Sequence, residues 1–178
     1  MIIREHTKAR MSFQRELEDR IRVSSRKEVV VFIHGYNNSF DDAVKSAAQI
    51  CNDLGANDFV CIAFTWQAGG RKGVLFGYNV DRESGEFSVP DLRKTFRMIA
   101  DIKSVGKVHV IAHSRGADLL ASAAQQLAIE VYSKRESLRK RFKLENIILA
   151  APDMDIDVAS TRVRAIVSDP DLYHTEAR

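Results

Sequence analysis

The sequence predicts an α/β protein: a mainly parallel sheet with helices on both faces. Short apolar runs such as VVVFI (29–33) and VHVIA (108–112) suit strands that are buried on both sides. Segments with apolar residues one helical turn apart separate these runs. Strands that alternate with helices are typical of a parallel sheet, and 178 residues suffice for a single domain, 1–178, with its own core.

The first half of the chain is expected to contain a helix, a strand, a helix and a strand. Met11, Gln14, Leu17 and Ile21 lie one turn apart, which predicts a helix over residues 8–22. The helix after the first strand has a capping pair, Ser39 and Asp42, and Gly55 is expected to end it. FVCIAFTW (59–66) predicts the second strand.

Residues 67–90 hold five of the nine glycines and are expected to form a long loop that ends at Pro90. A helix, the strand 108–112, a helix over 115–132 and the strand NIILAA (146–151) follow. The basic stretch 133–143 is interpreted as a solvated helix end and connector, because no aromatic nucleic-acid platform accompanies it.

The bulk properties exclude several classes of partner. A net charge of +3 does not indicate a nucleic-acid or membrane partner. The first twenty residues are too charged for a secretory signal, and no apolar run approaches the ~20 residues of a membrane span, so a cytoplasmic location is expected. Cys51 and Cys61 form no metal-ligand pattern and are expected to be reduced and mostly buried. No metal or organic cofactor is implied.

Three turns are expected to meet at one edge of the sheet. HGYNNS (34–39), HSRG (113–116) and PDMD (152–155) each follow a predicted strand. Ligands of open parallel sheets bind outside the carboxyl ends of the strands. The polar side chains of these turns are therefore the candidate functional residues.

The middle turn is typical of a nucleophile elbow, in which a serine lies between a strand and a helix in the pattern G-x-S-x-G. Ser114 is the candidate nucleophile; Gly116 keeps the pattern, and Ala112 departs from it by one methyl group. The alternative is a serine that caps the following helix. His113 is expected to point into the fold.

The other two turns would complete a hydrolytic site. The backbone N–H groups of Arg115 and Tyr36 are candidate oxyanion donors, and Gly35 would allow close approach of the backbone. His34 is interpreted as a residue that orders its loop rather than as a base.

The third turn supplies acids. Asp153 is preferred over Asp155 as the acid that would orient a catalytic histidine. The alternative is that these aspartates only cap the next helix.

Several motifs together resemble an α/β-hydrolase family of unknown substrate in the esterase/lipase superfamily. The family pattern runs H-G-Y-N, S-W, Y-x-x-D-R-E-S, H-S-x-G and A-P-D-x-D. Here it corresponds to VFIHGYNNSFDDAV, FTW, GYNVDRES, HVIAHSRG and ILAAPDMDIDV, over roughly residues 26–158.

The resemblance implies a partial α/β-hydrolase fold and a Ser-His-acid hydrolase acting on a small ester or similar acyl substrate. Ser114 matches the elbow serine, Tyr36 and Arg115 the oxyanion positions, and Asp153 the acid. Trp66 matches the S-W position, where Thr65 replaces the serine. Trp66 and His34 are the candidate substrate-binding residues.

The D-R-E-S segment, Asp81, Arg82 and Glu83, is interpreted as an ion-pair cluster that holds the long loop.

The resemblance also implies a catalytic histidine after the last strand of the fold. His174 is the only histidine after the acid, and it is expected to lie on a connector, so the base is expected beyond Arg178. The chain thus looks truncated, and as it stands it is expected to be a poor hydrolase. Residues 158–167 are read as a helix; as an alternative, VRAIV (163–167) forms a strand with Asp169 as the acid.

Two rival readings remain. One is a non-catalytic, hydrolase-like binding scaffold, whose mark would be the absence of a histidine near Ser114. The other is a nucleotide-binding protein, but neither G-x-G-x-x-G nor G-x-x-x-x-G-K-[S/T] occurs. The sequence does not indicate an oligomeric state.

Overall fold

The computed structural model describes the backbone of residues 2–68 and 74–167, and the side chains within residues 4–68, 84–164 and 166. Ten elements follow one another: α1 Ile2–Val23, β1 Glu28–Ile33, α2 Phe40–Gly55, β2 Phe59–Phe64, α3 Val74–Ala100, β3 Lys107–His113, α4 Arg115–Tyr132, α5 Leu138–Phe142, β4 Leu144–Ala150 and α6 Ile156–Val167. The predicted alternation of strands and helices is confirmed.

The four strands form one sheet in the order β2-β1-β3-β4, and each neighbouring pair is parallel. The central strand β1 is buried along its whole length, as its β-branched sequence predicted. The chain leaves β1 toward β2 on one side, and β3 and β4 lie on the other side. The turns after β1 and β3 are therefore neighbours at the point where the strand order reverses, where α/β proteins bind ligands.

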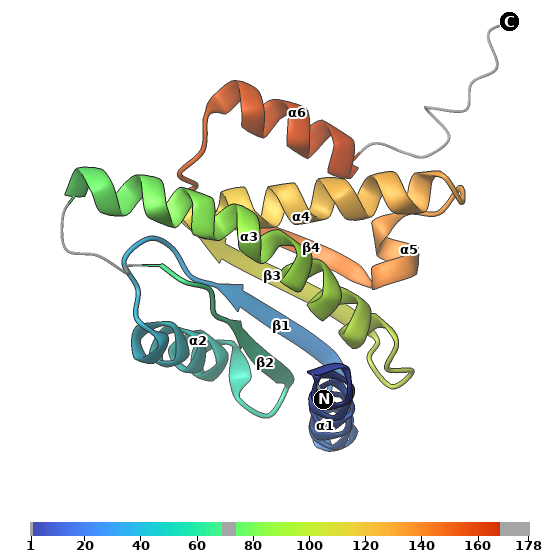
Figure 1. The fold of residues 1–178 in the computed structure, drawn as a ribbon. Helices are drawn as coiled ribbons and strands as arrows, with labels where there is room; N and C mark the ends of the chain where they lie inside the picture. The colour runs from blue at the N-terminus through green and yellow to red at the C-terminus, as the bar shows by residue number, and fades with distance from the viewer. Residues whose placement is uncertain (1, 69–73, 168–178) are drawn as a thin grey trace, which may run out of the picture.

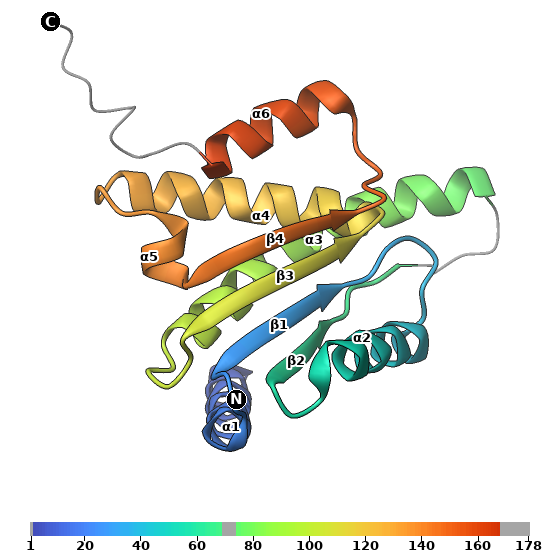
Figure 2. The ribbon, with the colours of Figure 1, turned by 180° about the vertical axis from the view of Figure 1, so that it is seen from behind.

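The helices form a layer on each face of the sheet. In Figure 1, α3 and α4 cover one face, and α6 lies outside α4. On the other face, α2 packs against β2 and β1. α1 contacts β2 and α3, so it lies beside α3 at the edge of the first face. Figure 2 shows that no helix of the described part lies in front of β3 and β4 on the face of α2, and Ile148 of β4 is 50% exposed. The predicted fold class is confirmed, but the second face is only half covered.

The prediction of a loop over residues 67–90 is wrong from residue 74 onward, because α3 begins at Val74 and contains Pro90. Val89 is 2% exposed and extends the apolar stripe of Leu92 and Phe96 across the proline. Burial of this stripe against the sheet outweighs the low helix propensity of glycine and proline. The ion-pair cluster expected of Asp81, Arg82 and Glu83 lies outside the described side chains; residues 69–73 lie outside the described backbone.

The expectation of reduced cysteines is also wrong, because Cys51 of α2 and Cys61 of β2 form a disulfide with a Cα–Cα distance of 6.0 Å. Both cysteines are half-buried. The apolar stripe of α2 turns Cys51 toward the sheet, and Cys61 lies on the face of β2 that α2 covers. The sequence alone did not place these two faces opposite each other.

The basic stretch 133–143 folds as a connector that contains α5, as expected. Leu138 and Phe142 anchor it in the core, and Arg139 and Arg141 pair with Glu145 and Asp101. VRAIV (163–167) belongs to α6, so the helix reading is confirmed and the strand alternative is wrong.

Candidate active site

The turn between β3 and α4 has the backbone of a strained elbow. Ser114 has φ 51° and ψ −122°, and its side chain makes no capping hydrogen bond to the helix that follows. A non-glycine residue in such a conformation costs on the order of 1–3 kcal/mol, and residues of this kind concentrate at functional sites. The helix-capping alternative for Ser114 is therefore not what the structure shows.

The elbow is tight because backbone from β1 lies directly beneath it. A Cβ atom at Gly116 would lie 2.5 Å from the carbonyl oxygen of His34 and 2.7 Å from that of Ile33. A Cβ atom at Gly35 would lie 2.7 Å from the Cβ of Ser114. The backbone of the two turns approaches so closely that both positions require glycine. Ala112, by contrast, lies within β3 with its methyl group fully buried, so the strand accommodates it.

The elbow is joined to the acid-bearing turn after β4 by backbone hydrogen bonds. The N–H of Ser114 donates to the carbonyl of Ala150 at 3.0 Å. The N–H of Asp153 donates to the carbonyl of Ser114 at 3.2 Å. The structure therefore brings Asp153 beside Ser114 by main-chain contacts.

A non-glycine residue with positive φ lies in or directly before each of the three turns. These residues are Asn37 at 53°, Ser114 at 51° and Ala151 at 44°. Asparagine tolerates this region, but serine and alanine rarely adopt it. Positive φ also occurs away from this edge, at Lys27, Arg135 and Lys143, so the strain that distinguishes the site is that of Ser114.

The side chain of Arg115 is buried and joins the elbow to its surroundings. Its Nη1 donates to the carbonyl of Asp153 at 3.3 Å, and its Nη2 pairs with the carboxylate of Asp118 at 3.3 Å. Asp118 also pairs with Arg162 of α6. The sequence analysis missed Asp118 and Arg162; the spacing of Arg115 and Asp118, one helical turn apart, was the available signal.

His34 is held in place at the turn after β1. Its side chain is 1% exposed, its Nε2 accepts a hydrogen bond from the N–H of Trp66 at 3.1 Å, and its Nδ1 lies 3.0 Å from the carbonyl of Gly35. Trp66 donates its Nε1–H to the carbonyl of His34 at 2.9 Å and stacks on the imidazole. Because Nε2 accepts, the proton lies on Nδ1. These contacts agree with the loop-ordering interpretation of His34.

The two candidate acids have different surroundings. The carboxylate of Asp155 accepts hydrogen bonds from the N–H groups of Asp157 and Val158, so it caps α6. Asp153 is half-buried and is tied to Ser114 and Arg115 through its backbone. The capping alternative thus describes Asp155, and the geometry agrees with the preference for Asp153.

The expectation that His113 points into the fold is wrong, because His113 is exposed. It alternates with Ala112 along β3 and shares the half-covered face with Ile111 and Ile148, where no described helix buries it. The Nδ1 of His113 lies 3.0 Å from the position of a Cβ at Gly35. His174, the other candidate base, lies outside the described residues.

Trp66 lines an open cavity of about 470 Å³ together with Phe40, Gln67, Phe87 and Asp91. This volume lies within the range of about 300–1,000 Å³ that is typical of small-molecule sites. Tyr36 is half-buried at the start of the neighbouring turn. Trp66 thus borders a cavity, and its role as a wall of the substrate site stays a prediction.

A parallel sheet, a strained serine elbow at its reversal point and an adjoining acid-bearing turn define a protein with an α/β-hydrolase-like fold. The chain belongs to the family described as "Alpha/beta hydrolase of unknown function (DUF900)", which it matches over residues 9–175. It is also similar to the uncharacterized protein alr1448 of Nostoc sp. (strain PCC 7120), with 26% identity over 167 residues. That match covers 72% of this chain and 43% of the relative, so the chain spans less than half of the relative's length.

Two further findings concern only the part of the chain that the structure describes. None of its helices is long and apolar enough to cross a membrane. No group of three or more His, Cys, Asp or Glu side chains there is arranged to hold a metal ion.

Proposed function

We propose that the site is that of a serine hydrolase that cleaves a carboxylic ester or a similar acyl substrate. Ser114 is the nucleophile, and the N–H groups of Tyr36 and Arg115 stabilise the oxyanion. Asp153 is the acid that orients a histidine. The observation that carries the proposal is the strained Ser114, whose hydroxyl makes no capping bond to α4.

The strained conformation supports a catalytic role through its cost. Relaxing the backbone of Ser114 would stabilise the fold. A strained residue at the reversal point of the sheet therefore supports a functional role for the Ser114 hydroxyl. The conformation turns the side chain away from the capping position. One removed oxyanion donor lowers the rate by about 10² to 10³ in other hydrolases, so the placement of the Tyr36 N–H is expected to matter, although less than Ser114 itself.

Within the described residues, neither histidine of the site's turns is placed as a base for Ser114. Loss of the histidine of a triad lowers kcat by on the order of 10⁶, about as much as loss of the serine. His113 is exposed beside the elbow, and His34 is held by Trp66 and its own loop. We therefore expect the 178-residue chain to react slowly at Ser114, with a base that free imidazole can partly replace.

The experiment is labelling with a fluorophosphonate, followed by intact-protein mass. The chain should gain one adduct slowly, imidazole should accelerate the reaction, and Ser114→Ala should abolish it. Ser133→Ala is the matched control, because Ser133 is exposed at the other end of α4. His113→Ala and His174→Ala report which histidine, if either, acts in the chain.

Absence of labelling with and without imidazole would refute the hydrolase proposal and leave the non-catalytic scaffold. That alternative is favoured by one observation: apart from the exposed His113 and the locked His34, the turns of the described site contain no histidine. Rapid labelling without imidazole would contradict the expected lack of a base.

The compartment and the substrate are also proposals. A cytoplasmic location stays a proposal, and the disulfide between Cys51 and Cys61, which is typical of an oxidising compartment, speaks against it. A small acyl ester is the proposed substrate; the cavity beside Trp66 has the volume of a small-molecule site, but neither Ser114 nor Tyr36 lines it.

A further inference from the structure

The helix after the acid-bearing turn, α6, is attached to α4 with little apolar burial. Figures 1 and 2 show α6 along the outer side of α4. Among the described side chains of α6, none is fully buried; Ala159, Arg162 and Ile166 are half-buried and lie one helical turn apart. These three residues form the inner face of α6, so a charged side chain, that of Arg162, lies in the middle of its contact with α4.

Arg162 is bound by Asp118 of α4, and the same carboxylate holds Arg115 of the elbow. The guanidinium of Arg162 pairs with the Asp118 carboxylate, and its Nη1 donates to the Asp118 carbonyl at 3.5 Å. On the other side, Nη2 of Arg115 lies 3.3 Å from the carboxylate. The side chains of Arg115, Asp118 and Arg162 are 10%, 17% and 21% exposed. One mostly buried carboxylate thus connects α6 to the elbow.

The guanidinium of Arg115 extends this connection to the acid-bearing turn. Its Nη1 donates to the carbonyl of Asp153 at 3.3 Å, and the N–H of Asp153 donates to the carbonyl of Ser114 at 3.2 Å. A guanidinium is planar and donates in fixed directions, so the carboxylate that binds Nη2 also sets the direction of Nη1. The bond from Arg115 to the acid-bearing turn therefore depends on Asp118.

Little free space surrounds this cluster. The cavity that Arg115 and Asp118 border together with Trp66 and Glu86 has a volume of about 10 Å³, which is the room of about one water molecule. Trp66 in turn holds His34 at the turn after β1, through the two hydrogen bonds between them. A displacement of the Arg115 side chain would therefore affect all three turns of the candidate site.

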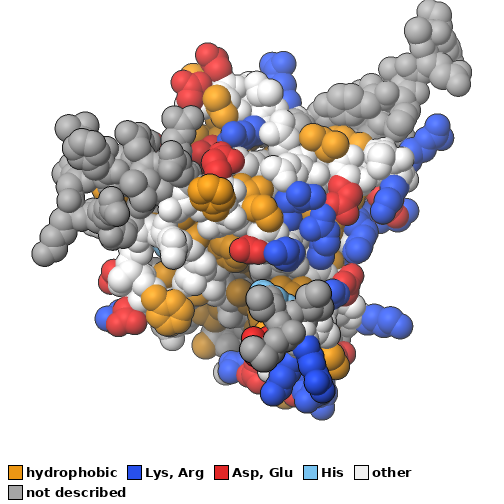
Figure 3. Space-filling model, in the orientation of Figure 1, with side chains coloured by type: hydrophobic (Ala, Val, Ile, Leu, Met, Phe, Trp, Pro, Cys, Tyr) orange, Lys and Arg blue, Asp and Glu red, His pale blue; other side chains and the backbone are white. Residues whose placement is uncertain are grey.

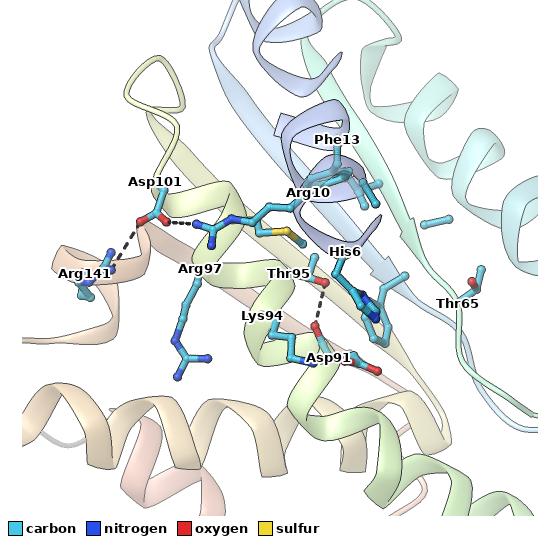
Figure 4. Close-up of a pocket in the computed structure, with 15 residues that line it drawn as sticks. His6, Arg10, Phe13, Thr65, Asp91, Lys94, Thr95, Arg97, Asp101 and Arg141 are labelled. Carbon is cyan, nitrogen blue, oxygen red and sulfur yellow. Dashed lines mark hydrogen bonds and ion pairs between the residues drawn. The ribbon is translucent and has the colours of Figure 1, made fainter. Parts of the chain in front are cut away.

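A second carboxylate between two arginines lies near the amino end of β3, at the opposite end of this strand from the candidate site. Figure 4 shows Arg10 and Arg141 approaching Asp101 from opposite sides, at 3.2 and 3.6 Å. The side chains of Arg10, Asp101 and Arg141 are 54%, 40% and 38% exposed. Figure 3 shows Lys and Arg side chains gathered over this surface, along α1 and the C-terminal half of α3. Water screens exposed charges, so this cluster is a weaker counterpart with the same composition.

We propose that Asp118 is a positioning residue of the candidate site, which orients the Arg115 guanidinium and, with Arg162, fixes the acid-bearing turn against the elbow. Removal of one partner from a buried ion pair leaves the other charge uncompensated, so Arg115 would leave its place without Asp118. The effect on catalysis is indirect, through the placement of the Arg115 N–H and of Asp153, and this part rests on the proposed function of Ser114. The effect on the turn does not.

The first measurement is hydrogen exchange of the two amides that join the elbow to the acid-bearing turn, those of Ser114 and Asp153. Asp118→Asn keeps the size of the side chain and removes its charge, and should accelerate exchange of both amides about tenfold. Asp101→Asn, in the exposed cluster, should leave them unchanged. Val131→Ala creates a cavity near the other end of α4 and should also leave them unchanged, because it lowers global stability without loosening the turn.

A second variant cuts the same connection from the side of α6. Arg162→Met should accelerate exchange at Asp153 in the same direction as Asp118→Asn. The double variant should add little, because residues of one ion-pair network are not additive. Melting temperatures should confirm that each variant folds.

The second measurement is fluorophosphonate labelling of Ser114 with imidazole, which supplies the same base to every variant. Asp118→Asn should lower the rate about tenfold through misplacement of the oxyanion donor. Asp118→Glu, which restores a carboxylate, should recover most of the rate. Val131→Ala should be labelled at the rate of the parent chain, a result that a merely structural role of Asp118 does not predict.

Three results would overturn the proposal. One is unchanged exchange at Ser114 and Asp153 in folded Asp118→Asn. Another is an equal acceleration in Asp101→Asn or Val131→Ala. The third is labelling of Asp118→Asn at the rate of the parent chain. Absence of labelling in the parent chain with imidazole would instead refute the proposed function, and exchange at Asp153 would still decide whether Asp118 holds the turn.

Discussion

Two helices follow the two backbone turns of the candidate site, and they are attached to the sheet in different ways. α4, after the elbow, has twelve buried residues, whereas α2, after the turn that follows β1, has two, Ala43 and Ala47. α2 is held by the capping box of Ser39 and Asp42 and by the disulfide from Cys51. Phe40 and Val44 of α2 are 68% and 40% exposed.

The difference teaches that the two halves of the site depend on different forces. The elbow is fixed by close packing, so it should respond to changes of volume. The turn after β1 is held by the capping box and the disulfide of α2, so it should respond to the removal of these bonds. The following predictions test this contrast, from the largest expected effect to the smallest.

The largest effect is expected at the crossing beneath the elbow. Gly116→Ala should lower the free energy of unfolding by about 3 kcal/mol, because the new Cβ would lie 2.5 Å from a carbonyl oxygen of the backbone. Urea unfolding measures it. Gly85→Ala in α3 is the control; its Cβ would lie 3.8 Å from Trp66, and alanine should stabilise the helix by about 0.5–1 kcal/mol. Similar destabilisation by both would contradict the packing argument.

The disulfide should matter for α2 and not for α4. Replacement of Cys51 and Cys61 by serine should lower the free energy of unfolding by about 2–3 kcal/mol, the usual contribution of a short disulfide loop. Hydrogen exchange should accelerate in α2 and remain unchanged in α4. A reductant should reproduce the effect in the parent chain only. Equal acceleration of hydrogen exchange in α2 and α4 would contradict the idea that the disulfide holds only α2.

The ion-pair cluster under the elbow is expected to contribute less. Asp118→Ala leaves Arg115 and Arg162 without their shared carboxylate and should cost about 2 kcal/mol, since the pair is mostly buried. Asp91→Ala removes an exposed pair with Lys94 and should cost under about 0.5 kcal/mol. Thermal unfolding of the two variants checks the order; the reverse order would count against the cluster.

Ser114 should be the one position where a substitution stabilises the elbow. Ser114→Gly relieves the strain of φ 51° and should raise the free energy of unfolding by about 1 kcal/mol while it abolishes fluorophosphonate labelling. Ser114→Ala keeps the strain and should be nearly neutral in stability. If glycine destabilises more than alanine, the conformation is not strained.

The smallest effect is expected where α4 meets α3. Hydrogen bonding with Arg97, opposed by partial burial, lowers the pKa of Glu130 from its ordinary 4.5, so the folded state binds its proton less readily than the unfolded state. The stabilisation is therefore present above about pH 4.5 and is lost as the pH falls through the lowered pKa. Glu130→Gln should cost about 0.5 kcal/mol at pH 7, and urea unfolding should show the cost shrinking as the pH falls below the ordinary pKa of 4.5. An equal cost above and below this pH would contradict it.

Local patterns were enough to predict much of this fold. β1 and β3 were predicted because β-branched runs favour strands. β1 is buried on both faces as expected, whereas β3 is buried on one face and only partly covered on the other. Ser39 and Asp42 form a capping box that involves only four consecutive residues. The elbow was predicted from Gly116 and Ser114, since backbone restriction is encoded in the residues of the turn itself.

The sequence by itself thus determined the fold class, the order of the elements and the residues that bear the candidate chemistry. Tertiary structure decided what depends on contacts between distant segments. It carried α3 through Pro90, paired Cys51 with Cys61, exposed His113 and set Asp118 between Arg115 and Arg162. The physical reason is that local patterns record what a segment can form, whereas the free energy of burying one segment against another selects among those forms.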